Sequence, residues 1–197
     1  MSSAEIGQSG TLSELFAEAV RRCRPSSVAV LGVAGGNGLD HIDSSITTRV
    51  VGLDLCPQYL EAVRQRHSRL PGLELHCVDL SAQLAGLEPA QLVHAALIFE
   101  HAGVHRCLEN TVSLVAPGGA LSVVLQLPAE SGQAAVTSRF SSIENLGPHF
   151  SVISPEWLCE SLAGRGFRLI HQSIRPLPAG KGFWAGMFSA PGGGVQK

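Results

Sequence analysis

The run VAVLGVAGGNG, residues 28–38, carries the clearest structural signal in this chain. Its first half is short and apolar throughout, as expected of a strand that is buried on both faces. Its second half is rich in glycine, which adopts positive φ angles readily and lets the backbone approach a ligand closely. The run therefore predicts a strand that ends in a tight turn. After the turn we expect a short helix with Leu39, Ile42 and Ile46 on one face.

Strand-like and helix-like segments alternate on both sides of this run. The first helix is expected to start at a capping box, Thr11-Leu12-Ser13-Glu14, and to stop at Pro25. Short apolar strands are expected after it at 50–53, 73–78, 92–99 and 120–127, separated by helices at 57–67 and 104–115. Such alternation predicts an α/β fold, with a doubly wound, mostly parallel sheet and helices on both faces.

The last quarter of the sequence breaks this alternation. A helix opens at Ser154-Pro155-Glu156 and ends at Gly164 and Gly166, and two strands follow at 167–174 and 183–188. The link from Arg175 to Gly182 is too short for a parallel crossover, so the last strand should run antiparallel. We interpret residues 1–197 as one domain, with flexible ends at 1–10 and 191–197 and an irregular segment at 128–153.

Composition narrows the classes of partner and the compartment. The formal net charge is −2, which gives no electrostatic footprint for nucleic acid or for an anionic membrane. No apolar run is long enough to span a bilayer, and no signal-peptide pattern opens the chain. The 5 cysteines form no C-x-x-C pair, which favours a reducing compartment and no metal site. The expected location is the cytoplasm.

Three features fall at the carboxyl ends of the first three predicted strands, where ligands of open α/β sheets bind. The first is the glycine-rich turn at 32–38. The second is Asp54, whose carboxylate can accept both hydroxyls of a ribose or can cap the helix that starts near Pro57. The third is Asp79, which can accept an adenine amine or cap the segment that starts at Ser81.

These runs, together with Val51-Gly52-Leu53-Asp54 and Cys77-Val78-Asp79, resemble the successive motifs of class I S-adenosylmethionine-dependent methyltransferases. The resemblance covers roughly residues 26–127 and 154–189, and implies a seven-stranded sheet with an antiparallel last strand. It implies S-adenosylmethionine as cofactor, with its methionine part over the glycine turn. The cofactor-binding residues that it implies are Gly32, Val33, Ala34, Gly36, Gly38, Asp54, Leu55, Asp79, Leu80 and Phe99.

The sequence departs from the family pattern at two positions of the turn. The family often has an acidic residue where Gly32 stands, supporting the amino group of the methionine part, and glycine where Ala34 stands. A second interpretation therefore stays open: a non-catalytic or regulatory protein that keeps the fold but binds the cofactor weakly or not at all. A dinucleotide enzyme fits less well, because Ala34 and Asn37 interrupt the G-x-G-x-x-G pattern and Asp40 and Asp43 would repel a pyrophosphate.

Methyl transfer depends mainly on in-line placement of the acceptor, with a general base where the acceptor is weakly acidic. Glu100 and His101 are the candidate catalytic residues, since they follow the fourth predicted strand. His101, His105 and Glu109 are spaced by four and could form a metal stripe, which we consider the weaker interpretation. No motif for a flipped base or a glutamine amide follows Phe99. We expect a small-molecule acceptor bound beside the 128–153 segment; the sequence leaves the oligomeric state open, with a dimer as one option.

Overall fold

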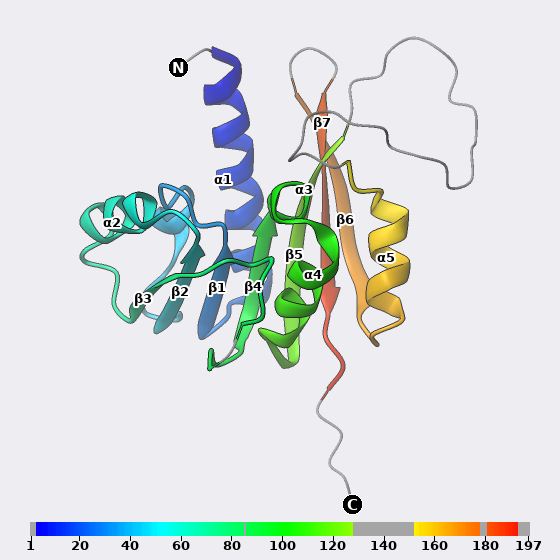
Figure 1. Ribbon diagram of the computed structural model, residues 1–197. Helices are drawn as coiled ribbons and strands as arrows, with labels where there is room; N and C mark the ends of the chain where they lie inside the picture. The colour runs from blue at the N-terminus through cyan, green and yellow to red at the C-terminus, as the bar shows by residue number, and fades with distance from the viewer. Residues whose placement is uncertain (1–2, 85, 128–151, 178–180, 193–197) are drawn as a thin grey trace, which may run out of the picture.

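One sheet organises the molecule (Figure 1). The structure, a computed structural model, describes residues 3–84, 86–127, 152–177 and 181–192. Its sheet has seven strands in the order β3-β2-β1-β4-β5-β7-β6. Their bounds are β1 Ser27–Leu31, β2 Arg49–Asp54, β3 Leu73–Cys77, β4 Ala90–Ala96, β5 Val115–Leu127, β6 Arg168–Pro176 and β7 Gly182–Ser189. The strand order steps outward from β1 in both directions, which is the doubly wound arrangement that the alternation predicted.

Strand directions follow the lengths of the connections. β1 pairs in parallel with β2 and β4, β2 with β3, and β4 with β5. β7 is antiparallel to both of its neighbours, β5 and β6, so it alone runs against the other strands. The prediction of a single antiparallel last strand is confirmed, because the short link after β6 can only reverse the chain.

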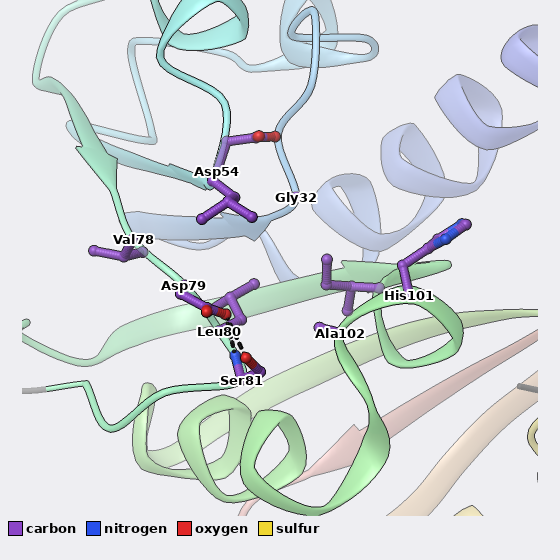
Figure 2. A pocket seen from close by; sticks show the side chains of 10 residues that line it. Gly32, Asp54, Val78, Asp79, Leu80, Ser81, His101 and Ala102 are labelled. Atoms are coloured by element: carbon purple, nitrogen blue, oxygen red, sulfur yellow. Dashed lines mark hydrogen bonds between the residues drawn. The ribbon is translucent and has the colours of Figure 1, made fainter. Parts of the chain in front are cut away.

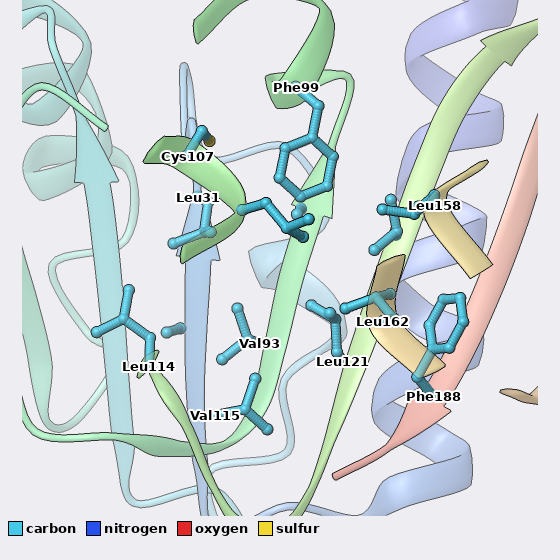
Figure 3. Close-up of a cluster of buried hydrophobic side chains, with 14 of the residues drawn as sticks. Leu31, Val93, Phe99, Cys107, Leu114, Val115, Leu121, Leu158, Leu162 and Phe188 are labelled. Carbon is cyan, nitrogen blue, oxygen red and sulfur yellow. The ribbon is translucent and has the colours of Figure 1, made fainter. Parts of the chain in front are cut away.

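Helices cover both faces of the sheet (Figure 1). α1 (Ser3–Cys23) and α2 (Pro57–Arg66) pack on one face, in a cluster that includes Phe16, Val20 and Val63. α4 (Val104–Ser113) and α5 (Pro155–Ala163) cover the other face, which Figure 3 shows. The apolar side chains there come from the strands, from both helices and from the residues next to α4 in the chain: Leu31, Val93, Phe99, Cys107, Leu114, Val115, Leu121, Leu158, Leu162 and Phe188.

Two of these helices start where the sequence predicted. Pro57 is the first residue of α2, where its missing N–H has no intrahelical partner to lose. Ser154 caps α5, and its hydroxyl accepts the N–H of Trp157 at 3.3 Å. α2 and the two strands beside it position the chain after Asp54, which is where the candidate site begins.

Two predicted boundaries in the first third of the chain were wrong. α1 begins at Ser3 and not at the Thr11 box. Because the turn before Thr11 is already helical, its carbonyls accept the N–H groups that a capping side chain would otherwise have to bind. The expected helix after the glycine turn is only a 3-10 turn, η1 (Leu39–His41), entered through Gly38 at φ +92°. Asp40 therefore lies in η1 and Asp43 beyond it, so the two do not share the first turn of an α-helix.

The fourth predicted strand was too long. β4 ends at Ala96, and Leu97 has φ +58°, a left-handed conformation that a strand cannot continue through. Residues Ile98–Ala102 then form a separate short helix, α3. Phe99 and Glu100 therefore belong to α3 and not to the end of a strand.

The predicted segments at the chain ends and at 128–153 are only partly covered. Residues 1–2, 128–151 and 193–197 lie outside the described residues, whereas Pro191 accepts the N–H of Gly118 through its carbonyl at 2.9 Å. Among the helices that the structure describes, none is long and apolar enough to cross a membrane.

Candidate functional site

A pocket of about 300 Å³ opens at the carboxyl ends of β1 to β4 (Figure 2). This volume is at the lower end of the usual range for small-molecule sites. Its walls come from the end of β1, the residues after β2 and β3, and helix α3. The lining residues are Gly32, Asp54, Leu55, Val78, Asp79, Leu80, Ser81, Ile98, His101 and Ala102.

Asp54 joins the two walls on the β1 and β2 side. Its Oδ2 accepts the N–H of Ala34 at 2.8 Å, and its Oδ1 accepts the N–H of Cys56 at 2.9 Å. The first bond holds the glycine turn, and the second satisfies the residue that precedes α2. The residue is 9% exposed, and each oxygen keeps a lone pair for a further donor. Asp54 therefore stabilises the turn before α2, whose N-cap is Cys56, and leaves capacity for a ribose hydroxyl.

The glycine turn folds back on the end of β2. The N–H groups of Gly32 and Val33 both donate to the carbonyl of Leu53, at 2.8 and 3.0 Å. At Gly36, with φ +75°, a Cβ atom would lie 2.8 Å from Nε2 of His67, so only glycine fits.

The turn contributes less to the pocket than the sequence predicted. Only Gly32 of this run lines the pocket, while the side chain of Val33 lies in the core and Gly36 and Gly38 are buried behind the turn. The prediction that Val33, Gly36 and Gly38 bind the cofactor therefore has no support in the pocket itself. Ala34 is exposed beside the pocket, and its N–H donates to Asp54, which lines the pocket.

Left-handed backbone conformations gather around this pocket. Gly32 has φ +69°, and the non-glycine residues Ala34 and Leu97 have φ +44° and +58°. Residues with side chains disfavour this region, and such strain persists where the surrounding contacts enforce it, often at functional sites. Here the enforcing contacts include the bond from Ala34 to Asp54 and the N–H of Leu97 donated to Val124 at 2.9 Å.

Asp79 stands on the opposite wall and is bonded locally. Its Oδ1 accepts the backbone N–H of Ser81 at 2.8 Å and the hydroxyl of Ser81 at 2.6 Å, drawn dashed in Figure 2. These bonds, the hydroxyl first, lower the pKa of Asp79 below its ordinary value, so the carboxylate is charged near neutral pH. Asp79 is exposed, and its Oδ2 accepts no hydrogen bond from the residues that the structure describes, which leaves it available to a donor such as an amine.

Hydrogen bonds from helix α4 position the segment after Asp79. Asn110 is 5% exposed, and its Nδ2 donates to the carbonyls of Leu80 at 2.9 Å and Ala82 at 2.7 Å. The sequence analysis did not identify Asn110. The only available signal was a polar residue at a helix position next to buried Cys107 and Leu108.

The two candidate catalytic residues have different surroundings. His101 lines the pocket, and in Figure 2 its ring points away from Asp79. Glu100 is 2% exposed, and its Oε1 accepts the N–H of Gln126 at 2.9 Å. Burial raises the pKa of Glu100, which favours the protonated form. The structure thus places Glu100 between α3 and β5 and outside the pocket lining, and its catalytic role stays a prediction.

Phe99 was expected to flank the cofactor, and the structure gives this expectation no support in the pocket lining. Its ring is fully buried in the core (Figure 3) and does not line the pocket, because α3 turns it inward. Ile98 and Ala102, which sequence reasoning missed, occupy the pocket wall instead. They have no chemical signature, and only the helical turn of α3 brings them there.

The metal stripe that the four-residue spacing suggested does not form. His101 is in α3, whereas His105 and Glu109 are in α4, and Gly103 at φ +75° separates the two helices. Glu109 forms an ion pair with Arg106. Over the described ranges, no group of three or more histidine, cysteine, aspartate or glutamate side chains could hold a metal ion.

Comparison with known proteins gives relatives in structure but none in sequence. No protein-family model matches the chain, and no curated protein sequence matches it. Among solved structures, the N-methyltransferase NodS from Bradyrhizobium japonicum WM9 has 18% identity and a TM-score of 0.67, covering 95% of this chain and 96% of that one. Magnesium protoporphyrin IX methyltransferase ChlM from Synechocystis PCC 6803, with bound S-adenosylmethionine, has 14% identity and a TM-score of 0.66, over 94% and 80%.

A third similar structure has a different named activity. The [4+2]-cyclase SpnF has 15% identity and a TM-score of 0.70, covering 93% of this chain and 81% of that one. At these identities the likeness concerns the fold. The chain has the fold of class I S-adenosylmethionine-dependent methyltransferases, as its motifs implied, and function must be argued from the site.

Proposed function

We propose that this protein is an S-adenosylmethionine-dependent methyltransferase that acts on a small molecule. The observation that carries the proposal is the pocket at the carboxyl ends of β1 to β4, with a carboxylate from β2 on one wall and a second carboxylate, after β3, on the other. Ligands of open α/β sheets bind at this edge. NodS has also been crystallised with S-adenosylhomocysteine.

The nucleoside half of the cofactor fits the residues present. Asp54 uses its remaining lone pairs to accept ribose hydroxyls, and Asp79, charged and exposed, accepts the adenine amine. Leu55, which is 67% exposed, and Leu80 provide apolar surface between the two carboxylates. When bound, S-adenosylmethionine supplies a methyl group on a sulfonium, which is ready for transfer to a nucleophile.

The protein's own contribution to the reaction is placement, with His101 as the candidate base. A positioned general base typically contributes 10²–10⁴-fold to the rate. His101 is the one imidazole among the described residues that line the pocket. It takes a proton from the acceptor, while α3, fixed to β5 through Glu100 and Gln126, keeps the histidine in place.

The acceptor is proposed to be a small molecule for electrostatic reasons. At a net charge of −2, the chain has little counterion release to draw on, and that release supplies most non-specific affinity for nucleic acid. We place the acceptor between α3 and the 128–153 segment, most of which lies outside the described residues.

A non-catalytic or regulatory role is the second candidate. Gly32 stands where the family often has an acid, and a cyclase, SpnF, has the same fold. The two candidates differ in whether methyl transfer occurs at all.

A methylation screen decides between the two candidates. The purified protein is incubated with cofactor labelled in its methyl group and with separate pools of metabolites, tRNA and proteins, while S-adenosylhomocysteine binding is measured by calorimetry. The proposal expects label in the metabolite pool. His101→Ala should lower kcat roughly 10²-fold with unchanged affinity for S-adenosylhomocysteine, whereas His105→Ala, exposed on α4, should match the wild type. Label only in macromolecules would contradict a small-molecule acceptor, and binding without any label would favour the non-catalytic role.

A further inference from the structure

Both carboxylates of the described pocket lining follow strands β2 and β3, and none belongs to β1 or α3. Among the described lining residues, the carboxylates are Asp54 and Asp79, at the ends of β2 and β3. The side formed by β1 and α3 is lined by Gly32, Ile98 and Ala102, which carry no charge, and by His101, which has no carboxylate. An ammonium group on this side meets no carboxylate from the lining that the structure describes.

Ile98 fills the place that an acidic side chain at Gly32 would need. A Cβ atom at Gly32 would lie 2.9 Å from Cδ1 of Ile98, closer than such contacts are found. Gly32 also has φ +69°, which disfavours residues with side chains. The backbone conformation therefore disfavours an acid at this position, and the tip of Ile98 would have to move to admit one.

The next carboxyl group along α3 does not compensate. Glu100 is 2% exposed and directs Oε1 to the N–H of Gln126, on the far side of α3 from the pocket lining. Within the described residues its Oε2 has no hydrogen-bond partner, so a buried charge there would be poorly stabilised. Because Glu100 is buried and bonded to β5, it does not face a cation in the pocket.

We infer that the pocket recognises the adenine nucleoside part of its ligand and is indifferent to the charged amino-acid tail. The ligand class is a 5′-thio-substituted adenosine, whether its tail is zwitterionic, as in S-adenosylhomocysteine, or uncharged, as in 5′-methylthioadenosine. This inference rests on the proposed function only for the location of the nucleoside. It differs from that proposal in predicting that the α-amino and α-carboxylate groups add little affinity.

Calorimetric titration of the wild-type protein tests the inference directly. S-adenosylhomocysteine, 5′-methylthioadenosine, adenosine and S-adenosylmethionine are titrated under one buffer condition. The expected dissociation constants of the first two differ by no more than about threefold. An ammonium–carboxylate contact, if the pocket provided one, would tighten S-adenosylhomocysteine binding by roughly tenfold or more. S-adenosylhomocysteine binding at least tenfold tighter than 5′-methylthioadenosine overturns the inference and leaves the proposed methyltransferase function standing.

The same titration separates the two proposals in the other direction. If 5′-methylthioadenosine binds while S-adenosylmethionine does not, the nucleoside site stands and the methyltransferase function fails. If none of these adenosines binds, the inference and the proposed function both fail.

A matched pair of variants adds a test that does not depend on the wild-type comparison. Ile98→Glu places a carboxylate beside Gly32, and Ile98→Gln places a side chain of the same shape without the charge. The Glu variant should bind S-adenosylhomocysteine about fivefold or more tightly than the Gln variant, with equal affinity of the two for 5′-methylthioadenosine. Equal S-adenosylhomocysteine affinity in the two variants contradicts the inference, because the ammonium would then already have a partner.

Discussion

Ala34 has φ +44° at the turn that the family usually builds with glycine at this position. A left-handed conformation costs an L-residue roughly 1–2 kcal/mol, and glycine avoids this cost but loses more backbone entropy on folding. Ala34→Gly should therefore raise the free energy of unfolding by about 0.5–1 kcal/mol. Urea denaturation measures the change. Ala82→Gly is the control: Ala82 has no positive φ, so this variant protein should be less stable than the wild type. A destabilised Ala34→Gly protein would contradict the claim that the backbone is strained at Ala34.

Asp54 combines a structural with a proposed binding role, so its substitution should affect both. Asp54→Ala leaves the N–H groups of Ala34 and Cys56 without acceptors and removes the charge proposed for ribose. We expect about 2–3 kcal/mol lower affinity for S-adenosylhomocysteine and a lower melting temperature. Calorimetry measures the affinity and thermal denaturation measures the melting temperature. Glu61→Gln, at an exposed position of α2, is the control. A lower melting temperature with unchanged affinity would leave Asp54 only its structural role as acceptor for Ala34 and Cys56.

Single residues also show where sequence reasoning stops. Asp54 and Asp79 were recognised because each directly follows an apolar run, and strand ends of a parallel sheet meet at one edge. Phe99 was misplaced because Leu97, an apolar residue with φ +58°, ends β4 early. Apolar periodicity does not distinguish a buried strand from a short buried helix, so the direction of the side chains in α3 could not be predicted.

The packing of α1 on β4 and β5 contains a titratable group that should make stability depend on pH. His94 of β4 is 4% exposed, contacts the ring of Phe16 edge-on at 5.0 Å between centroids, and lies 3.1 Å from Oγ of Ser122 through Nδ1. Burial lowers its pKa from 6.5 to about 4. As the pH falls, His94 therefore binds a proton near pH 6.5 in the unfolded chain, but only near pH 4 in the folded protein.

Stability from His94 is thus fully present above pH 6.5 and is lost as the pH falls towards 4. The loss should approach about 3 kcal/mol, at 1.36 kcal/mol for each pKa unit. His94→Gln does not titrate, so the difference in unfolding free energy between wild type and variant isolates this effect from the surface carboxylates. Urea titrations at pH 7, 6, 5 and 4.5 measure it. A pH-independent difference would mean that His94 has the same pKa in the folded and the unfolded protein.

Helix α4 positions one pocket wall through Asn110. Asn110→Leu keeps the volume but leaves the carbonyls of Leu80 and Ala82 without their donors. We expect a loss of about 2 kcal/mol in stability and several-fold weaker adenosine binding at a temperature where the variant stays folded. Glu109→Gln, exposed on the same helix, is the control. Unchanged adenosine affinity in the folded Asn110→Leu protein would show that the wall holds without this residue.

The whole molecule follows from a few sequence features, and its site only in part. Alternating apolar strands and helices predicted the doubly wound sheet, and the short link after β6 predicted the reversed β7. Neither feature carries information on how wall residues from α3 and α4 meet the strand ends. That placement depends on tertiary packing around Leu97 and Asn110, which local patterns do not encode.

The same architecture predicts how stability and ligand protection are distributed over the chain. β1, β4 and β5 each have a strand on both sides, while β3 and β6 each have one neighbour among the described strands. Amides of central, buried strands open only with the global unfolding of the protein, so β1, β4 and β5 should exchange most slowly with deuterium and β6 much faster.

Adding S-adenosylhomocysteine should slow exchange at 32–34, 54–56, 78–81 and 97–102, the segments that form the pocket. Strand β6, at the far edge, should not change and serves as the internal control, because no pocket residue belongs to it. Hydrogen exchange read by mass spectrometry measures all of these segments in one experiment. Protection that instead appears in the groove of Asp40, Arg66 and Arg69, behind the glycine turn, would move the binding site away from the strand ends.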